Sequence, residues 1–190
     1  MINRKWTDSE LVERAQAGDR KAYSTLVERH MSRLYRLARR MNLSPEDAAD
    51  AIQETFLAAY RALPRFDFSY QFSTWITRIL LNRISKVHRG LRRMRRILIS
   101  REMSPAEVDA LEQVRPATPH ELLEQSELHD HLERAIQKLP VPQRMVFILF
   151  EMEGYKIHEI AKILDIPEGT VTSRLHHARK FLRKILHENL

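Results

Sequence analysis

The sequence lacks cysteine, has little glycine and contains no long apolar run, and each of these absences narrows the class of protein. Without cysteine there is no disulfide framework, which fits a reducing compartment. The longest apolar stretches, ILLNRI and MVFILFEM, are too short to cross a bilayer, and MINRKWTDSE lacks the apolar core of a signal peptide. Four glycines in 190 residues, with abundant Leu, Ala, Arg and Glu, favour helices. We therefore expect an all-α, cytoplasmic protein that does not insert into a membrane.

The charge balance indicates an anionic partner. The formal net charge is +7 and the pI is about 9.9, which is most simply explained by nucleic-acid binding. A membrane surface is the weaker alternative, because the basic residues do not lie opposite a purely apolar face. Residues 83–101 carry eight Lys or Arg and no acid, whereas residues 102–130 carry eight acids and one Arg.

The acidic stretch after Arg101 is predicted to be a linker between two domains. Three prolines interrupt it and aromatic residues are absent, which is typical of a chain segment that forms no packed core. A transient helix over residues 104–114 is compatible with this pattern. Whether the linker only spaces the two domains or has a function of its own stays open.

The N-terminal half contains four predicted helices, each bounded by capping residues, proline or glycine. They run from Thr7 to Gly18, from Asp19 to Met41, from Ser44 to about Leu63, and from Ser73 to Gly90. The third helix places apolar or small side chains at helical spacing, which predicts its inward face: Ala48, Ala51, Ile52, Thr55, Phe56, Ala59 and Tyr60.

Aromatic residues are concentrated before and at the start of the fourth helix. They are Tyr60, Phe66, Phe68, Tyr70, Phe72 and Trp75, and the basic run follows them. Aromatic faces stack on unpaired bases while Lys and Arg follow phosphates, so this order indicates single-stranded nucleic acid. The alternative is a core helix with a solvated basic end. We favour that alternative for Trp75 and the neighbouring isoleucines only.

The third helix is acidic within a basic protein. Glu46 and Asp47 lie in its first turn, where the helix dipole favours them without any partner. Asp50 and Glu54 lie four residues apart and gain nothing from each other. They are either solvated or, as we favour, contacted by a basic protein partner.

Four further helices are predicted in the C-terminal part. They run from about Thr118 to Leu139, from Arg144 to Glu153, from Ile157 to Leu164, and from Thr170 to about His187. The last two, with the turn at residues 165–169, have helix-turn-helix proportions. Residues early in the second of these helices are expected to reach base edges, and later basic residues to contact phosphate. The expected exposed face carries Thr172, Ser173, His176, His177, Arg179 and Lys180, followed by Arg183 and Lys184.

Catalytic and metal-binding signatures are missing from the sequence. Several histidines are present, but none has the spacing of a metal site, and no thiolate is available. No glycine-rich phosphate loop or GxSxG motif occurs either. We expect no enzyme activity, no metal, no cofactor and no small-molecule substrate.

The whole chain resembles bacterial RNA polymerase sigma factors of the extracytoplasmic-function (ECF) type, group 4 of the sigma-70 family. DAADAIQETFLAAYRAL resembles region 2.2, and FSTWITRILLNRISKVHR resembles regions 2.3 to 2.4. The long segment LPVPQRMVFILFEMEGYKIHEIAKILDIPEGTVTSRLHHARKFLRKIL resembles region 4. The resemblance implies region 2 at residues 1–96, a flexible acidic linker at 97–118, and region 4 at 119–190.

The resemblance also implies partners and residue roles. Region 2.2 would dock on the β′ clamp helices of core polymerase through Asp50, Gln53 and Glu54. Region 4 would contact the β flap, the linker would follow the active-centre and RNA-exit path, and an anti-sigma factor is expected as a further partner. The −10 element would be captured as a single strand by Phe66, Phe68, Ser69, Tyr70, Gln71, Phe72 and Ser73, and then held by Arg78, Asn82, Arg83 and Lys86. The −35 element would be read by Thr172, Ser173, His176 and His177, with Arg174, Arg179 and Lys180 nearer the backbone.

One departure from the family concerns the base-capturing loop. Where related loops commonly have a Gly-Glu-Ser type sequence, this chain has residues 67–71, DFSYQ, with no glycine and two extra aromatics.

Two functions other than that of a sigma factor are alternatives for this chain. A stand-alone helix-turn-helix regulator leaves the acidic third helix and the aromatic loop unexplained, and an RNA- or single-strand-binding module leaves the helix-turn-helix without a role.

Overall fold

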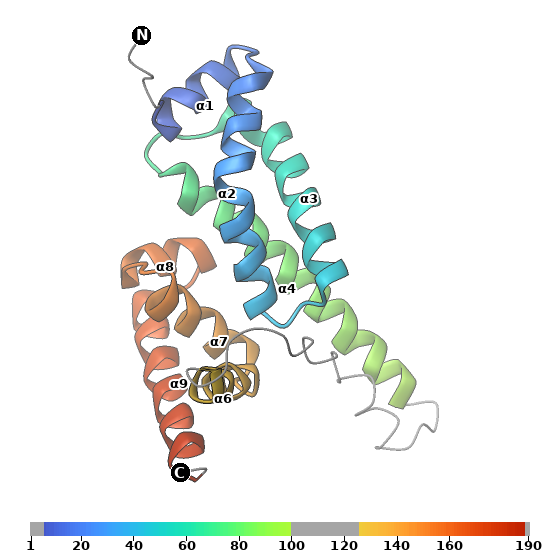
Figure 1. Ribbon diagram of the computed structural model, residues 1–190, viewed down its shortest axis with the longest axis vertical. Helices are drawn as coiled ribbons and strands as arrows, with labels where there is room; N and C mark the ends of the chain where they lie inside the picture. The colour runs from blue at the N-terminus through green and yellow to red at the C-terminus, as the bar shows by residue number, and fades with distance from the viewer. Residues whose placement is uncertain (1–5, 100–125, 189–190) are drawn as a thin grey trace.

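The computed structural model describes residues 6–99 and 126–188, and these residues are helical with no strand. Figure 1 shows an N-terminal unit in blue to green above a C-terminal unit in orange to red. The N-terminal unit comprises α1 (Asp8–Gln16), α2 (Arg20–Arg40), α3 (Pro45–Ala62), the short 3-10 helix η1 (Leu63–Arg65) and α4 (Phe72–Ile99). The C-terminal unit comprises α6 (Ser126–Gln137), α7 (Val141–Phe147), the π-helix η2 (Ile148–Met152), α8 (Ile157–Leu164) and α9 (Glu168–Glu188). The expected all-α, two-part architecture is confirmed.

Local capping signals begin the first three helices where the sequence predicts. The Thr7 hydroxyl accepts the Glu10 amide while the Glu10 carboxylate accepts the Thr7 amide at 2.8 Å, which is a complete capping box. The Asp19 carboxylate accepts two first-turn amides of α2. Ser44 caps α3, with Pro45 at its first position. Free amides at these helix ends are thereby satisfied by residues adjacent in sequence.

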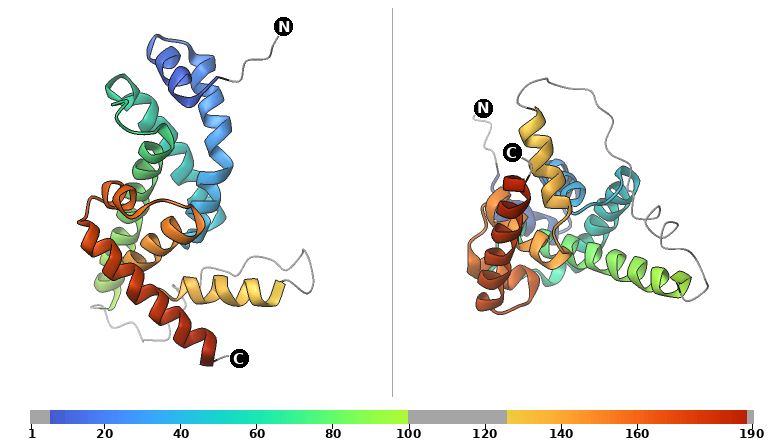
Figure 2. Two further views of the ribbon diagram at one scale, coloured as in Figure 1. Left: turned by 90° about the vertical axis from the view of Figure 1, so that its left-hand side faces the viewer. Right: turned by 90° about the horizontal axis from the view of Figure 1, so that it is seen from below.

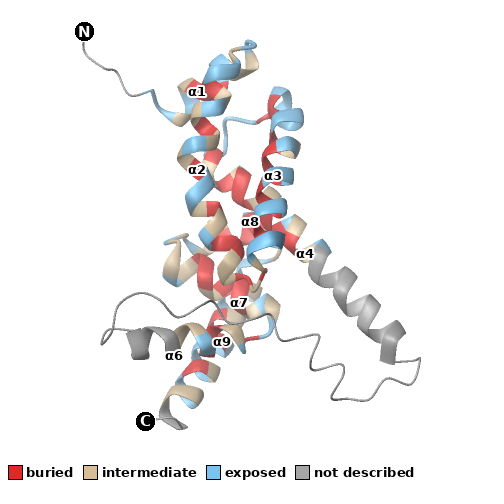
Figure 3. Ribbon diagram, turned by 45° about the vertical axis from the view of Figure 1, so that its right-hand side comes forward, coloured by how far each residue is buried: buried red, intermediate tan, exposed pale blue. Residues whose placement is uncertain are grey.

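The N-terminal core lies among α2, α3 and α4. Leu34, Leu37, Ile76 and Leu80 are fully buried there, and the buried positions line the inner faces of the helices in Figure 3. Trp75 and Ile79 are partly buried against this core. Tyr60 is a correction to the predicted inward face of the third helix, because its side chain is 45% exposed. It lies at the edge of the α2–α3 pair, outside the core.

The C-terminal unit packs α6, α7 and α8 against α9. Asp165 adopts a left-handed conformation with φ 55° and ends α8, and the Ile166 amide returns to the Ala161 carbonyl at 3.1 Å. After Pro167, α9 begins at Glu168, so the predicted helix-turn-helix is present with a tighter turn than expected. Buried Arg144 donates to the carbonyls of Gln137, the last residue of α6, and of Leu139 just beyond it.

Some helix boundaries differ from the expected ones. Helix α4 continues through Gly90 to Ile99, since a single internal glycine costs only about 1 kcal/mol relative to alanine and no proline follows nearby. Helix α7 starts at Val141, ahead of the expected Arg144, because Pro142 occupies a first-turn position that needs no amide donor. The predicted linker from residue 100 on, and the expected helix start near Thr118, lie outside the described residues.

The two units pack against each other. Helix α8 lies beside α4, and both views in Figure 2 show the orange segment against the green one. The contact brings the start of α4, which follows the aromatic loop, next to the C-terminal unit. This arrangement determines which of the predicted binding residues are open to a partner.

Candidate nucleic-acid interface

The aromatic loop, residues 66–72, consists of two buried anchors and two exposed rings. Phe66 and Phe72 are only 7% and 3% exposed, and their ring centroids lie 5.0 and 5.7 Å from that of Trp75. Phe68 and Tyr70 are 47% and 38% exposed. The anchors are therefore part of the core, and only Phe68 and Tyr70 present faces on which a base can stack.

Hydrogen bonds within the loop form a turn between the two exposed rings. The Asp67 carboxylate accepts the Ser69 hydroxyl at 2.6 Å and the Ser69 amide at 2.9 Å, and these bonds lower the pKa of the Asp67 carboxyl. The Tyr70 amide donates to the Asp67 carbonyl at 3.2 Å. This Asx-type turn shapes the tip of the loop without glycine. The Ser69 hydroxyl is engaged in the turn, whereas Gln71 is exposed beside it.

A buried histidine packs against an anchor of the loop. His30 of α2 lies with its Nε2 2.7 Å from Asp8 of α1, and its ring is 5.3 Å from Phe72. Burial lowers the pKa of His30, although its bond to Asp8 acts in the opposite direction. No sequence pattern indicated this role for His30, because Asp8 and Phe72 are distant from it along the chain. Its contact with Phe72 makes it a support of the loop.

The basic residues predicted to hold −10 DNA lie along α4 beyond the loop. Asn82 and Lys86 are exposed, and Arg78 is half-buried. Arg83 forms an ion pair with Glu54 of α3. The structure therefore joins two residues that the sequence assigned to different partners, one to DNA and one to polymerase.

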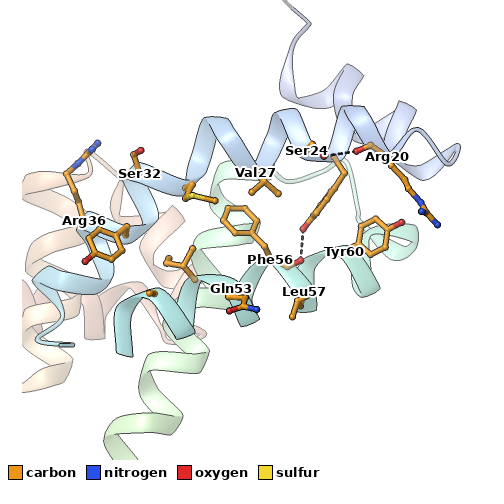
Figure 4. Close-up of a pocket in the computed structure, with 14 residues that line it drawn as sticks. Arg20, Ser24, Val27, Ser32, Arg36, Gln53, Phe56, Leu57 and Tyr60 are labelled. Carbon is orange, nitrogen blue, oxygen red and sulfur yellow. Dashed lines mark hydrogen bonds between the residues drawn. The ribbon is translucent and has the colours of Figure 1, made fainter. Parts of the chain in front are cut away.

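The predicted polymerase-contacting residues Asp50, Gln53 and Glu54 all lie exposed on α3. Gln53 also borders a groove of about 930 Å³ between α2 and α3. Figure 4 shows Phe56 between the two helices, with Leu57 and Tyr60 beside it on α3. Met31, Leu57 and Tyr60 are each nearly half exposed along this groove. The sequence did not reveal this apolar surface, because it is formed by residues of two helices.

Tyr23 of α2 joins the two helices at the base of this groove. The Tyr23 hydroxyl donates to the Phe56 carbonyl at 2.6 Å, and the Tyr23 and Tyr60 rings meet edge to face at 4.9 Å. Burial raises the pKa of Tyr23, so its hydroxyl remains a donor at any physiological pH. The groove thus carries a preformed apolar face next to an acidic helix edge.

The recognition-helix residues lie where the sequence predicted them. Thr172, Ser173, His176, His177 and Lys180 are exposed on α9, and Arg174 is half-buried. Arg179 is held within its own unit: its guanidinium donates to Glu151 of η2 at 2.6 and 2.9 Å and lies 5.4 Å from the Phe150 ring. Four early-turn side chains are therefore exposed on α9, and Arg179 is held beside them by Glu151.

No cluster of three or more His, Cys, Asp or Glu side chains suited to a metal occurs among the described residues. Within the same residues, no helix is both long and apolar enough to cross a membrane.

Two family descriptions match this chain. Sigma-70 region 2 matches residues 26–96, and Sigma-70 region 4 matches residues 129–182. The chain is 36% identical over 180 residues to the ECF RNA polymerase sigma factor SigM of Mycobacterium tuberculosis, covering 95% of this chain and 85% of the relative. It is 36% identical over 190 residues to the ECF RNA polymerase sigma-E factor of Escherichia coli, covering 94% of each.

Solved structures agree with these matches. CnrH, determined in complex with the cytosolic domain of CnrY, superposes with a TM-score of 0.68 at 26% identity, covering 96% of this chain and 99% of CnrH. The sigma factor RpoE of Bartonella quintana, determined with the anti-sigma factor NepR, shares the fold at a TM-score of 0.69 and 22% identity, covering 88% of this chain and 98% of RpoE.

A helical unit with an exposed aromatic loop, joined to a helix-turn-helix unit, defines a two-part DNA-binding protein of the transcription machinery. The chain belongs to the ECF RNA polymerase sigma factors. It is accordingly an alternative sigma factor that directs transcription initiation, in a family whose members are initiation factors and not enzymes.

Proposed function

We propose that this sigma factor binds core polymerase in the cytoplasm, reads two promoter elements, and favours melting by holding unpaired bases of the −10 strand. The observation that carries the melting role is the loop in which buried Phe66 and Phe72 support exposed Phe68 and Tyr70. Since the anchors belong to the core, the two exposed rings need little reordering to accept bases. The loop is thus preorganised for an unpaired strand.

The −35 element is proposed to be read by the early turns of α9. Thr172, Ser173, His176 and His177 are exposed on one helix, as base readout in a major groove requires. Lys180 and Arg174 would contact the backbone, and Arg179 would do so only by leaving Glu151 or by sharing its guanidinium. The chain would thereby contact duplex and single-stranded DNA through different units.

Core polymerase is proposed to dock on α3 and the adjoining groove. Asp50 and Gln53 supply polar contacts, while Met31, Leu57 and Tyr60 supply an apolar surface that nothing in the described chain covers. We assign this surface to the β′ clamp helices, and the C-terminal unit to the β flap. Residues 1–96 and 119–190 would form the two binding domains, with the segment between them passing through the polymerase.

An anti-sigma factor is proposed as the partner that holds the chain inactive. Two proteins with this fold were determined in complexes, CnrH with the cytosolic domain of CnrY and the Bartonella quintana sigma factor RpoE with the anti-sigma factor NepR. Because this chain has the same fold, an equivalent partner would bind its two packed units.

The loop assignment is tested by Phe68→Ala and Tyr70→Ala. Loss of one stacked base costs about 1–3 kcal/mol, so each variant is expected to lower open-complex formation by about 5- to 150-fold. Duplex promoter binding by the holoenzyme should change little. Permanganate footprinting of the melted region and a filter-binding assay on duplex DNA separate the two effects.

Two matched control variants keep an aromatic ring at each of the two positions. Phe68→Tyr and Tyr70→Phe retain a stacking face and should melt promoters as the wild type does. Equal losses in melting and duplex binding for the alanine variants would contradict the single-strand role. Retention on core polymerase, followed by transcription from a randomised promoter library, tests the wider assignment and yields both element sequences.

A further inference from the structure

The two units meet at a polar cluster centred on Arg33 of α2. One guanidinium nitrogen, Nη1, donates to the Glu153 carboxylate at 2.9 Å and to the Tyr155 hydroxyl at 3.3 Å, both in the C-terminal unit. The other nitrogen, Nη2, donates to the Thr77 hydroxyl at 2.8 Å and to the Ser73 carbonyl at 3.4 Å, both on α4. The N-terminal unit therefore holds one side of the guanidinium, and the C-terminal unit occupies the other.

Glu153 is almost enclosed in this contact. Its side chain is 7% exposed, and Arg40 Nη1 lies 3.8 Å from its second oxygen, Oε1. Arg40 also lies 3.7 Å from Glu133 of α6. Two cations of the N-terminal unit thus converge on acids that all come from the C-terminal unit. If the two units part, Arg33 and Arg40 lose these acids together.

We propose that Arg33, aided by Arg40, binds a phosphate of a single DNA strand, and that the Glu153 carboxylate fills this site when the two units are packed together. Guanidinium groups bind carboxylate and phosphate oxygens with the same geometry. Because Nη2 is held by Thr77 and Ser73, Arg33 keeps its orientation after Glu153 leaves. The site is therefore ready to accept an oxyanion.

The position of the cluster links it to the aromatic loop. Ser73 directly follows the loop, so a strand with bases on Phe68 and Tyr70 would carry its phosphates past the first turns of α4. The packed C-terminal unit also contacts the loop itself, since Lys162 of α8 places its ammonium 5.8 Å from the Tyr70 ring centroid. The packed chain thus competes with DNA at both the base face and the phosphate site. This inference rests on the proposed single-strand function of the loop.

The competition is tested on the full chain with a fluorescent, random-sequence single strand and anisotropy titration. Glu153→Gln removes the carboxylate that fills the site, and Tyr155→Phe removes one hydroxyl from the contact without changing charge. Weakening the contact by one or two kcal/mol is expected to tighten strand binding by about 5- to 30-fold. Glu13→Gln is the matched control, because it removes the same charge from an exposed residue of α1, away from the contact between the units. No tighter binding by Glu153→Gln and Tyr155→Phe than by Glu13→Gln would overturn the proposal.

The phosphate role of Arg33 is tested by salt dependence in the Glu153→Gln background. Adding Arg33→Gln is expected to reduce the slope of log K against log salt by about 0.7, the value for one phosphate of a single strand. Arg14→Gln in the same background is the control, because Arg14 pairs with Asp19 at the far end of α2 and should leave the slope unchanged. An unchanged slope with Arg33→Gln would mean that Arg33 only joins the two units and does not bind a phosphate.

Phe68→Ala in the same titration separates this inference from the proposed function. If Phe68→Ala weakens strand binding while Glu153→Gln matches its control, the loop binds DNA and the competition is wrong. If neither the wild type nor Glu153→Gln binds the strand, the proposed function and this inference both fail.

Discussion

The aromatic loop and the exposed face of α9, the two surfaces that we propose contact DNA, are built in opposite ways. The loop depends on residues from α1, α2 and α4, because Phe66 and Phe72 are buried against Trp75 and supported by His30. The recognition residues of α9 project from one helix and need only that helix to be aligned. A surface that rests on buried side chains loses its shape when those side chains are mutated. A surface on one exposed helix face tolerates side-chain substitutions without loss of the fold.

The two surfaces also differ in their availability. Helix α8 packs beside α4 (Figure 2) and places the Lys162 ammonium 5.8 Å from the Tyr70 ring centroid, so the C-terminal unit contacts the loop. Helix α9 packs mainly on α6, α7 and α8 of its own unit. Of the two proposed activities, single-strand binding is therefore linked to the relative position of the units, and duplex reading is not.

The largest expected effect comes from removing an anchor of the loop. Phe72→Ala should lower the free energy of unfolding by about 3–5 kcal/mol, because it empties a fully packed site. Phe68→Ala should cost about 1 kcal/mol, the size of its one aromatic pair with Phe66. Urea denaturation followed by circular dichroism measures both. Equal losses would mean that the buried and exposed rings of the loop do not have separate roles.

A smaller effect, confined to specificity, is expected on the recognition helix. His176→Ala should reduce discrimination between −35 sequences by about 1–3 kcal/mol, the usual cost of one lost base contact. Its free energy of unfolding should stay within about 0.5 kcal/mol of the wild type, because the side chain is exposed. Competition binding with −35 variants measures the first quantity, and unchanged discrimination would remove His176 from the reading residues.

The last effect is a pH dependence at the support of the loop. Burial places the folded-state pKa of His30 below its ordinary value of 6.5, with Asp8 opposing the shift and Arg29 and Arg33 adding to it. Stability from neutral His30 is therefore complete above pH 6.5 and is lost as the pH falls from 6.5 toward the folded-state pKa.

His30→Gln keeps a hydrogen-bond donor toward Asp8 and removes the titration. Between about pH 8 and about pH 5, the wild type should lose more stability than this variant does. Urea denaturation at several pH values measures the difference. Parallel stability curves for the two proteins would show that His30 does not contribute to the pH dependence.

The sequence alone determined those features whose physical causes are local. Thr7, Asp19 and Ser44 satisfy amides within three residues of themselves, so helix starts followed from neighbouring side chains. Apolar spacing and the Asp165–Pro167 turn likewise predicted the helix-turn-helix, and motif order predicted the family. The exposed positions of Thr172, Ser173, His176 and His177 followed from the periodicity of one helix.

The tertiary structure decided which of the predicted residues are open to a partner. Phe66 and Phe72 look like Phe68 and Tyr70 in the sequence, yet the first pair is buried because Trp75 and His30 meet it in space. The apolar groove of α2 and α3 and the pairing of Arg83 with Glu54 arise in the same way. Arg33 and Glu153 are 120 residues apart, so no local pattern links them. Their contact exists only because packing of the two units brings opposite charges together.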